Sequence, residues 1–166
     1  MRTRQLGKDG PDVSVIGLGA WPIGGGMGPV DEKIAIDTVR SAIDAGVTLL
    51  DTAQAYRSSE STLGKALEEG YRDRCFLATK VSGDYSAAGI RAAMDASLKA
   101  LDVDYVDLYQ VHSWRGADYP IEATMEAMSQ LQQQGKTRYI GVSNFNATQM
   151  DAAYSVAPFH SSQPQY

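Results

Sequence analysis

Four residues that can hold or move a proton lie at or shortly after the ends of short apolar runs in this chain. They are Asp51, Tyr56, Lys80 and His112. The run 47–50 ends directly on Asp51, and Tyr56 comes five residues later in a segment without a strong breaker. Polar residues that end buried parallel strands gather at one rim of the sheet, so we expect Asp51 and Tyr56 to meet the later strand ends there.

Placed together, these residue types suit proton transfer to an oxygen atom. A tyrosine hydroxyl has an ordinary pKa of about 10, which makes it a reluctant acid or base at neutral pH. A lysine ammonium about 4 Å away favours the phenolate by about 4 kcal/mol at an effective dielectric constant of about 20. That is an upper figure of about three pKa units, enough to bring a tyrosine into working range. Asp51 would keep Lys80 charged, and His112 would hydrogen-bond the substrate oxygen.

Each residue also has an ordinary structural explanation. Asp51 can cap a turn or a helix, because aspartate side chains bond to nearby backbone amides. Lys80 can be a solvated charge at a strand end, and His112 can be a structural histidine whose ring nitrogens are satisfied by neighbours. Tyr56 alone carries little information. What favours a functional set is that these polar groups recur in phase with a structural period.

That period comes from a regular alternation of predicted strands and helices. Strands are predicted at 47–50, 75–80, 105–112 and 139–143. Helices are predicted at 31–45, through Leu63 and Leu67 to Gly70, and from Ser86 through Leu101. A fourth helix is predicted from the apolar stripe Ile121, Met125, Met128 and Leu131. A fifth is predicted from a capping box at Asn146 and Gln149 to Pro158. Strict alternation argues for parallel strands with helical crossovers.

The two ends of the chain are predicted to be simpler. Residues 4–6 and 13–16 read as a small hairpin, and 15–18 as the start of the first core strand. A glycine-rich loop, 17–28, follows. The last segment, 161–166, is extended in composition.

Strand ends recur every 29 to 32 residues, at Gly19, Asp51, Lys80, His112 and Ser143. A (β/α)8 TIM-type barrel of about 250 residues has about 31 residues per unit. A doubly wound sheet alternates as well, but it concentrates its site at one crevice, whereas here each strand from the second to the fifth ends on a polar group. We therefore predict a single α/β domain over 1–166, an incomplete barrel of about six strands preceded by a hairpin.

Composition excludes several classes of protein. The net charge of −5 with interspersed charges argues against nucleic acid as a partner, and the chain lacks an apolar run long enough for a membrane span. One cysteine, Cys75, excludes an intrachain disulfide framework and fits a reducing, cytoplasmic compartment. His112 and His160 with Cys75 do not form a metal set, so we expect no metal.

Several stretches together resemble the aldo-keto reductase family over almost the whole chain. They are 17–21 (GLGAW), 51–56 (DTAQAY), Glu60 with 63–67 (LGKAL), 78–80 (ATK), 104–112 (DYVDLYQVH), 135–136 with 140–145 (GK, IGVSNF) and 163–166 (QPQY). The resemblance implies a catalytic tetrad of Asp51, Tyr56, Lys80 and His112. In it, Tyr56 is the general acid, Lys80 lowers its pKa, Asp51 holds Lys80, and His112 orients the carbonyl of a small aldehyde or ketone.

The resemblance also implies a nicotinamide cofactor, NADPH. Its carboxamide contacts would fall on Ser143, Asn144 and Gln163, beside Asp51. Trp21 resembles a substrate-pocket aromatic, with ordinary loop packing as the alternative. The family's contacts to the adenosine and its 2′-phosphate lie beyond these residues, so we expect the isolated chain to bind NADPH weakly and turn over slowly.

Other functions remain open from the residues. The same tetrad run backwards is an alcohol or sugar dehydrogenase, and the residues do not distinguish direction. A cofactor-binding regulatory subunit and a catalytically inactive truncated fragment are further alternatives. Open barrel edges predict self-association of the chain.

Overall fold

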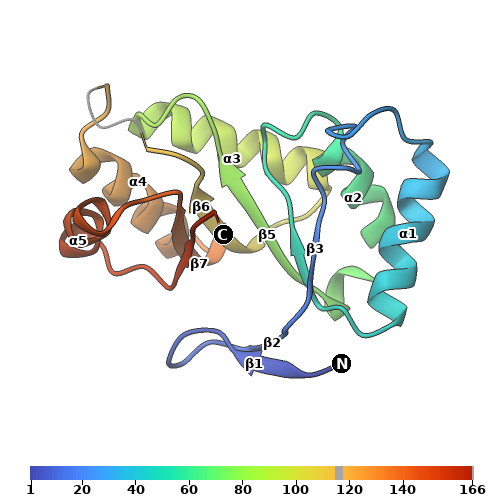
Figure 1. Cartoon of the computed structure of the whole chain (residues 1–166). Helices are drawn as coiled ribbons and strands as arrows, with labels where there is room; N and C mark the ends of the chain where they lie inside the picture. Colours follow the sequence, from blue (N-terminus) through green and yellow to red (C-terminus); the bar gives the residue numbers. More distant parts are fainter. Residues whose placement is uncertain (115–117, 166) are drawn as a thin grey trace.

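The computed structural model describes residues 1–114 and 118–165 as a curled parallel sheet with helices around its outer side (Figure 1). The strands, in the same order in space and in sequence, are β3 (Gly17–Gly19), β4 (Leu49–Asp51), β5 (Phe76–Val81), β6 (Val106–Val111), β7 (Thr137–Ser143) and β8 (Ser161–Gln163). Every neighbouring pair is parallel. This is the predicted six-stranded part of a (β/α)8 barrel.

The helices of the described residues begin close to the predicted caps. They are α1 (Glu32–Asp44), α2 (Ser59–Leu67), α3 (Ala87–Leu101), α4 (Ile121–Gln133) and α5 (Ala147–Val156), with a short 3-10 turn η1 (Arg72–Arg74) before β5. The Ser86 hydroxyl accepts the Gly89 amide at 3.0 Å, and Asn146 with Gln149 forms the predicted capping box. These bonds satisfy amides that a helix start leaves without partners.

Several strands differ from prediction by one or two residues at an end; β4 was predicted at 47–50 and β7 at 139–143, against Leu49–Asp51 and Thr137–Ser143. The first sheet strand is Gly17–Gly19 and not 15–18, because the Ser14 hydroxyl accepts the amides of Thr48 and Leu49 and so replaces a strand pairing there. β5 runs one residue past Lys80, and β6 ends one residue before His112.

The segment predicted only as extended contains a strand, β8, which pairs with β7. A backbone hydrogen bond from the amide of Asn144 to the carbonyl oxygen of Gln163 continues this pairing. This bond carries the β7–β8 ladder just past the last residue of β7, at the carboxyl end of the sheet. Tyr166, the last residue of that predicted segment, lies outside the described residues.

The hairpin of β1 (Thr3–Gln5) and β2 (Asp12–Ser14) lies at the amino ends of the sheet strands (Figure 1). Val13 of β2 packs on a small inner cluster with three sheet residues: Phe76, Ala78 and Leu108. The main core lies on the other face of the sheet, against the helices. Apolar side chains therefore fill the inner face near the amino ends, which leaves the carboxyl ends for polar groups.

β3 and β8 are the edge strands of the sheet formed by the described residues. Association of copies through these edges stays a prediction. Among the described residues, no helix combines the length and the apolar character that crossing a bilayer demands.

The α2–α3 packing makes a specific prediction for Gly64. A Cβ at Gly64 would lie 2.7 Å from the Leu101 carbonyl oxygen, so α2 and α3 are in close backbone contact there. We expect Gly64→Ala to lower the free energy of unfolding by about 1–3 kcal/mol in urea titrations, despite alanine's better helix propensity. Gly19→Ala is the control, because a Cβ there meets nothing within 4 Å. Equal stability of the Gly64→Ala variant and the wild type would contradict this packing.

Candidate active site

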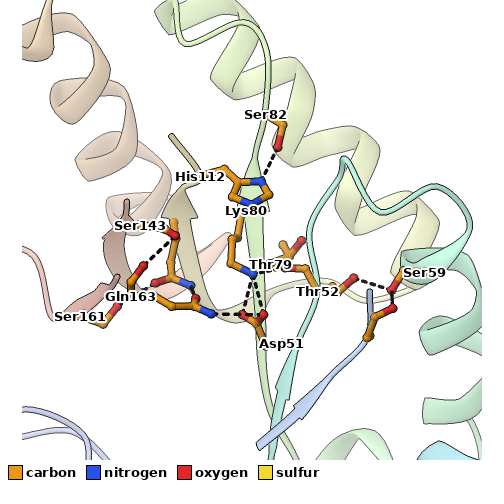
Figure 2. Close-up of polar contacts among 12 residues, drawn as sticks. Asp51, Thr52, Ser59, Thr79, Lys80, Ser82, His112, Ser143, Ser161 and Gln163 are labelled. Atoms are coloured by element: carbon orange, nitrogen blue, oxygen red, sulfur yellow. Dashed lines mark hydrogen bonds and ion pairs between the residues drawn. The ribbon is translucent and has the colours of Figure 1, made fainter. Parts of the chain in front are cut away.

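The centre of the polar end of the sheet is a buried ion pair between Lys80 and Asp51 (Figure 2). Lys80 Nζ donates to both carboxylate oxygens of Asp51 at 2.7 Å and to the carbonyl oxygen of Thr52 at 2.8 Å. The Lys80 side chain is 1% exposed and that of Asp51 is 20% exposed. Burial lowers the pKa of Lys80, and the charge of Asp51 opposes that shift.

Strand register explains how these side chains meet. Asp51 pairs with Ala78 on β5, and Lys80 pairs with Gln110 on β6. Side chains two positions apart on a strand share a face, so Asp51, Lys80 and Gln110 all belong to the inner face of the sheet. His112 follows Gln110 by the same step of two.

Tyr56 lies between Lys80 and His112. Lys80 Nζ is 5.2 Å from the centroid of the Tyr56 ring, and the His112 ring meets that ring edge-on at 5.6 Å between centroids. Among the hydrogen bonds of residues 1–114 and 118–165, none involves the Tyr56 hydroxyl. That hydroxyl is therefore available to a substrate.

The expected lowering of the Tyr56 pKa by Lys80 is wrong for this structure. The pKa of Tyr56 is raised above its ordinary value, first by burial and then by the negative charge of Asp51. Two features explain the difference. The ammonium of Lys80 lies over the face of the ring, and the carboxylate bound to it offsets its positive charge.

The loop that carries Tyr56 is anchored by the first two residues of α2. Ser59 Oγ donates to the Ala20 carbonyl oxygen at 2.9 Å, so its 2.8 Å contact with Thr52 Oγ1 has Thr52 as donor. The buried carboxylate of Glu60 accepts the Thr79 hydroxyl at 2.6 Å, next to Lys80 in the sequence. These bonds tie the Tyr56 loop to the ends of β3, β4 and β5.

His112 is held by a residue that the sequence did not indicate. Its Nδ1 lies 2.8 Å from Ser82 Oγ (Figure 2), which leaves Nε2 to face a substrate. Burial, followed by the charge of Lys80, lowers the pKa of His112, with Asp51 opposing. The imidazole is therefore neutral at neutral pH.

The predicted carboxamide contacts gather beside the ion pair. Asn144, in a left-handed conformation with φ of 58°, donates through Nδ2 to the His112 carbonyl oxygen at 3.0 Å. Ser143 Oγ donates to the Gln163 carbonyl oxygen at 2.9 Å, and Gln163 Nε2 lies 3.5 Å from Asp51 Oδ2 (Figure 2).

This group of side chains fits a primary carboxamide, which needs both a donor and an acceptor. Asn144 follows β7, and Gln163 is the last residue of the neighbouring β8. Each amide carries both kinds of group, and Gln163 Oε1 already accepts from Gln110 Nε2. The structure thus brings together Asp51 and Lys80 with the predicted carboxamide contacts. The roles of these residues stay predictions.

Trp21 is less closely tied to this group. Its side chain is 47% exposed, and its ring packs against Gly26, where a Cβ would come within 2.4 Å of the indole. The absence of a side chain at Gly26 thus leaves the space that the Trp21 ring occupies. A substrate contact by Trp21 stays a prediction.

Three polar residues of the site were missed from the sequence: Thr52, Ser82 and Gln110. A usable signal existed for two of them. Ser82 follows Lys80 by two positions and Gln110 precedes His112 by two, so each shares a face with a predicted site residue. Thr52 acts through its backbone carbonyl, which no residue pattern could reveal.

Known proteins similar to this chain point to one family. A sequence model of the Aldo/keto reductase family matches residues 15–166. The chain is 47% identical over 179 residues to the aldo-keto reductase YhdN of Bacillus subtilis (strain 168), covering 100% of this chain and 54% of YhdN. It is 39% identical over 150 residues to the L-galactose dehydrogenase of Arabidopsis thaliana, covering 84% of this chain and 47% of that protein.

Solved structures give the same result. The thermostable aldo-keto reductase Tm1743 superposes with a TM-score of 0.93 at 34% identity, over 100% of this chain and 63% of that one. The aldo-keto reductase AKR11C1 from Bacillus halodurans, in its holo form, gives 0.90 at 34% identity, over 100% and 58%. These neighbours are (β/α)8 barrels. The chain belongs to the aldo/keto reductase family, and it spans about half the length of the curated relatives it matches.

The buried ion pair predicts an asymmetry between two substitutions. Asp51→Ala leaves the Lys80 ammonium without its carboxylate, so we expect a loss of about 3–5 kcal/mol in unfolding free energy, towards the lower figure because Asp51 is partly exposed. Lys80→Met removes the buried charge and should cost far less. The double variant should recover most of the stability lost in Asp51→Ala. Urea unfolding of all three variants measures this, and an Asp51→Ala variant as stable as the wild type would contradict it.

Proposed function

We propose that this chain carries the catalytic half of an NADPH-dependent reductase that converts aldehydes or ketones to alcohols. The observation that carries the proposal is the convergence of Tyr56 and His112 on the Lys80–Asp51 pair, with the tyrosine hydroxyl free. A free acid beside a neutral imidazole is the arrangement that protonation of a carbonyl oxygen requires.

In the proposed reaction, a hydride reaches the carbonyl carbon and the Tyr56 hydroxyl gives its proton to the carbonyl oxygen. The nicotinamide ring, when bound, supplies the hydride. His112 donates from Nε2 to the same oxygen and orients it, while Ser82 fixes the opposite ring nitrogen. Asp51 keeps Lys80 in place, and Lys80 in turn supports the Tyr56 ring from one face. Ser143, Asn144 and Gln163 would hold the carboxamide of the ring.

Tyr56 is in the protonation state from which reduction starts, while the cellular ratio of reduced to oxidised cofactor sets the net direction. A raised pKa keeps the hydroxyl protonated at neutral pH, which is the form that reduction consumes. Oxidation of an alcohol starts from the tyrosinate. The second candidate, a sugar or alcohol dehydrogenase, draws support from the likeness to L-galactose dehydrogenase.

NADPH as the donor rests on the family likeness, and the cytoplasm as the compartment rests on a single, half-buried cysteine. Titrating NADPH and NADH against the protein by fluorescence quenching measures the affinity for each. We expect the isolated chain to bind both weakly and with similar affinity, because the family's contacts to the 2′-phosphate are expected outside these residues.

The central substitution is Tyr56→Phe. We expect carbonyl reduction to fall by about 10²–10⁴-fold, because the proton donor is lost, while NADPH binding stays within about twofold of wild type. Aldehyde-dependent NADPH oxidation and fluorescence quenching measure the two quantities. Ser61→Ala is the matched control, since among the described residues this exposed hydroxyl on α2 bonds only to the Ser58 carbonyl oxygen, in the first turn of the helix.

The chain can be assayed alone and fused to the portion of YhdN outside the matched segment. Wild-type rates for Tyr56→Phe in an active protein would overturn the proposal. Cofactor binding without turnover in both forms would instead indicate a regulatory module. Failure of both forms to bind a nicotinamide cofactor would indicate an inactive fragment.

The pKa directions predict the pH dependence of reduction. Tyr56 loses its proton only above its ordinary pKa of 10.0, so the alkaline fall in rate should lie above pH 10. His112 gains a proton only below its ordinary value of 6.5, so the acid limb should lie below pH 6.5. A pH–rate profile with an aldehyde substrate measures both limbs, and an alkaline limb near pH 8 would show that Lys80 does lower the tyrosine pKa.

A further inference from the structure

Gln110 is a buried polar residue that the proposed reaction does not use. It lies on β6 at 2% exposure, in register with Lys80 on one side and Gly141 on the other. A buried amide needs partners for both its carbonyl and its NH2 group. Gln110 finds them on β8, two strands away.

A row of three residues makes that reach possible. Gln110 pairs with Gly141 on β7, and Gly141 pairs with Ser161 on β8. A Cβ at Gly141 would lie 2.2 Å from Ser161 Oγ and 3.2 Å from Gln110 Cγ. The missing side chain of Gly141 therefore leaves the space in which Gln110 crosses to β8.

In the hydrogen bonds across this space, each residue donates to the next one along a chain of bonds. Ser161 Oγ donates to Gln110 Oε1 at 3.2 Å, and Gln110 Nε2 donates to Gln163 Oε1 at 2.9 Å. Gln163 Nε2 then points to Asp51 Oδ2 at 3.5 Å. An ionised carboxylate only accepts hydrogen bonds, so it is the NH2 group of Gln163 that can face Asp51.

The last bond of this chain is its weakest. At 3.5 Å the contact between Gln163 Nε2 and Asp51 lies beyond the ordinary range for N–H···O bonds, while the bond that holds Gln163 Oε1 is of normal length. The carbonyl of Gln163 is therefore fixed from behind. Its NH2 group stays available to an incoming acceptor beside the Lys80–Asp51 pair.

We propose that Gln110 is a positioning residue that turns the Gln163 amide so that its NH2 group, and not its carbonyl, faces the cofactor carboxamide. The proposal rests on the proposed function. With the Gln163 NH2 group facing the cofactor, the site binds a hydrogen-bond acceptor, the carboxamide oxygen, beside Gln163. Gln110 itself touches neither substrate nor cofactor.

Reversing the polarity at Gln110 tests this directly. In Gln110→Glu at pH 9 the ionised carboxylate accepts from Gln163 Nε2, so Gln163 turns its carbonyl towards the cofactor. NADP+ can rotate its carboxamide so that the carboxamide NH2 group donates to the Gln163 carbonyl. The 3-acetylpyridine analogue of NADP+ offers only a carbonyl, and two acceptors then face each other.

The measurement is the ratio of dissociation constants, analogue over NADP+, by fluorescence or calorimetry. We expect a ratio near one for the wild type and about ten for Gln110→Glu, the effect of one unpaired buried group. Gln110→Met, which has no polarity to impose, and Ser161→Ala, which keeps the bond from Gln110 to Gln163, should both stay near one. An unchanged ratio in Gln110→Glu would overturn the proposal.

A second measurement needs no cofactor. In nitrogen-15 spectra, the side-chain NH2 resonances of Gln163 should shift between the wild type and Asp51→Asn, since they face that carboxylate. In the Gln110→Glu background that response should be lost, and Gly141→Ala, which closes the crossing space, should weaken it. The same response in wild type and Gln110→Glu would overturn the relay even with a functioning cofactor site. A wild type that shows the response but binds no nicotinamide would overturn the proposed function alone.

Discussion

A buried ammonium is the constraint on which this site depends. Lys80 lies 1% exposed at the end of β5, and an unpaired charge there would cost several kcal/mol. Three acceptors meet that demand: both oxygens of Asp51 and the carbonyl of Thr52. The end of β4 must therefore stay in register with β5, and the loop that follows β4 brings Tyr56 over the ammonium.

Every second residue of each strand points to the inner face of the sheet, and these inward residues form an apolar layer followed by a polar layer. Ala78 and Leu108 belong to the apolar layer beneath the hairpin, and the next inward residues, Lys80 and Gln110, begin the polar layer. His112 is one further step along. The same strands thus stabilise the fold at one end and present chemistry at the other, without any change in their geometry.

Features that depend on local pattern could be predicted from the sequence. The helices followed from apolar spacing and from caps such as Ser86 and Asn146, and the inward strand ends followed from polar residues at a constant period. Features that depend on how residues from different elements pack together could not be predicted from the sequence. The raised pKa of Tyr56 rests first on the burial of the ring and then on the position of Asp51. The Gln110 relay rests on the space left by Gly141. The first strand was misplaced because a single hydroxyl, that of Ser14, replaced a backbone pairing.

Isotope transfer is the sharpest test of carbonyl reduction at this site. NADPH carrying deuterium at the transferable position of its nicotinamide ring is incubated with the protein and an aldehyde, and the alcohol is analysed by mass spectrometry and proton NMR. We expect one deuterium on the former carbonyl carbon and a solvent-exchangeable proton on its oxygen. Alcohol formed without deuterium on that carbon, or no alcohol from a protein that binds NADPH, would contradict it.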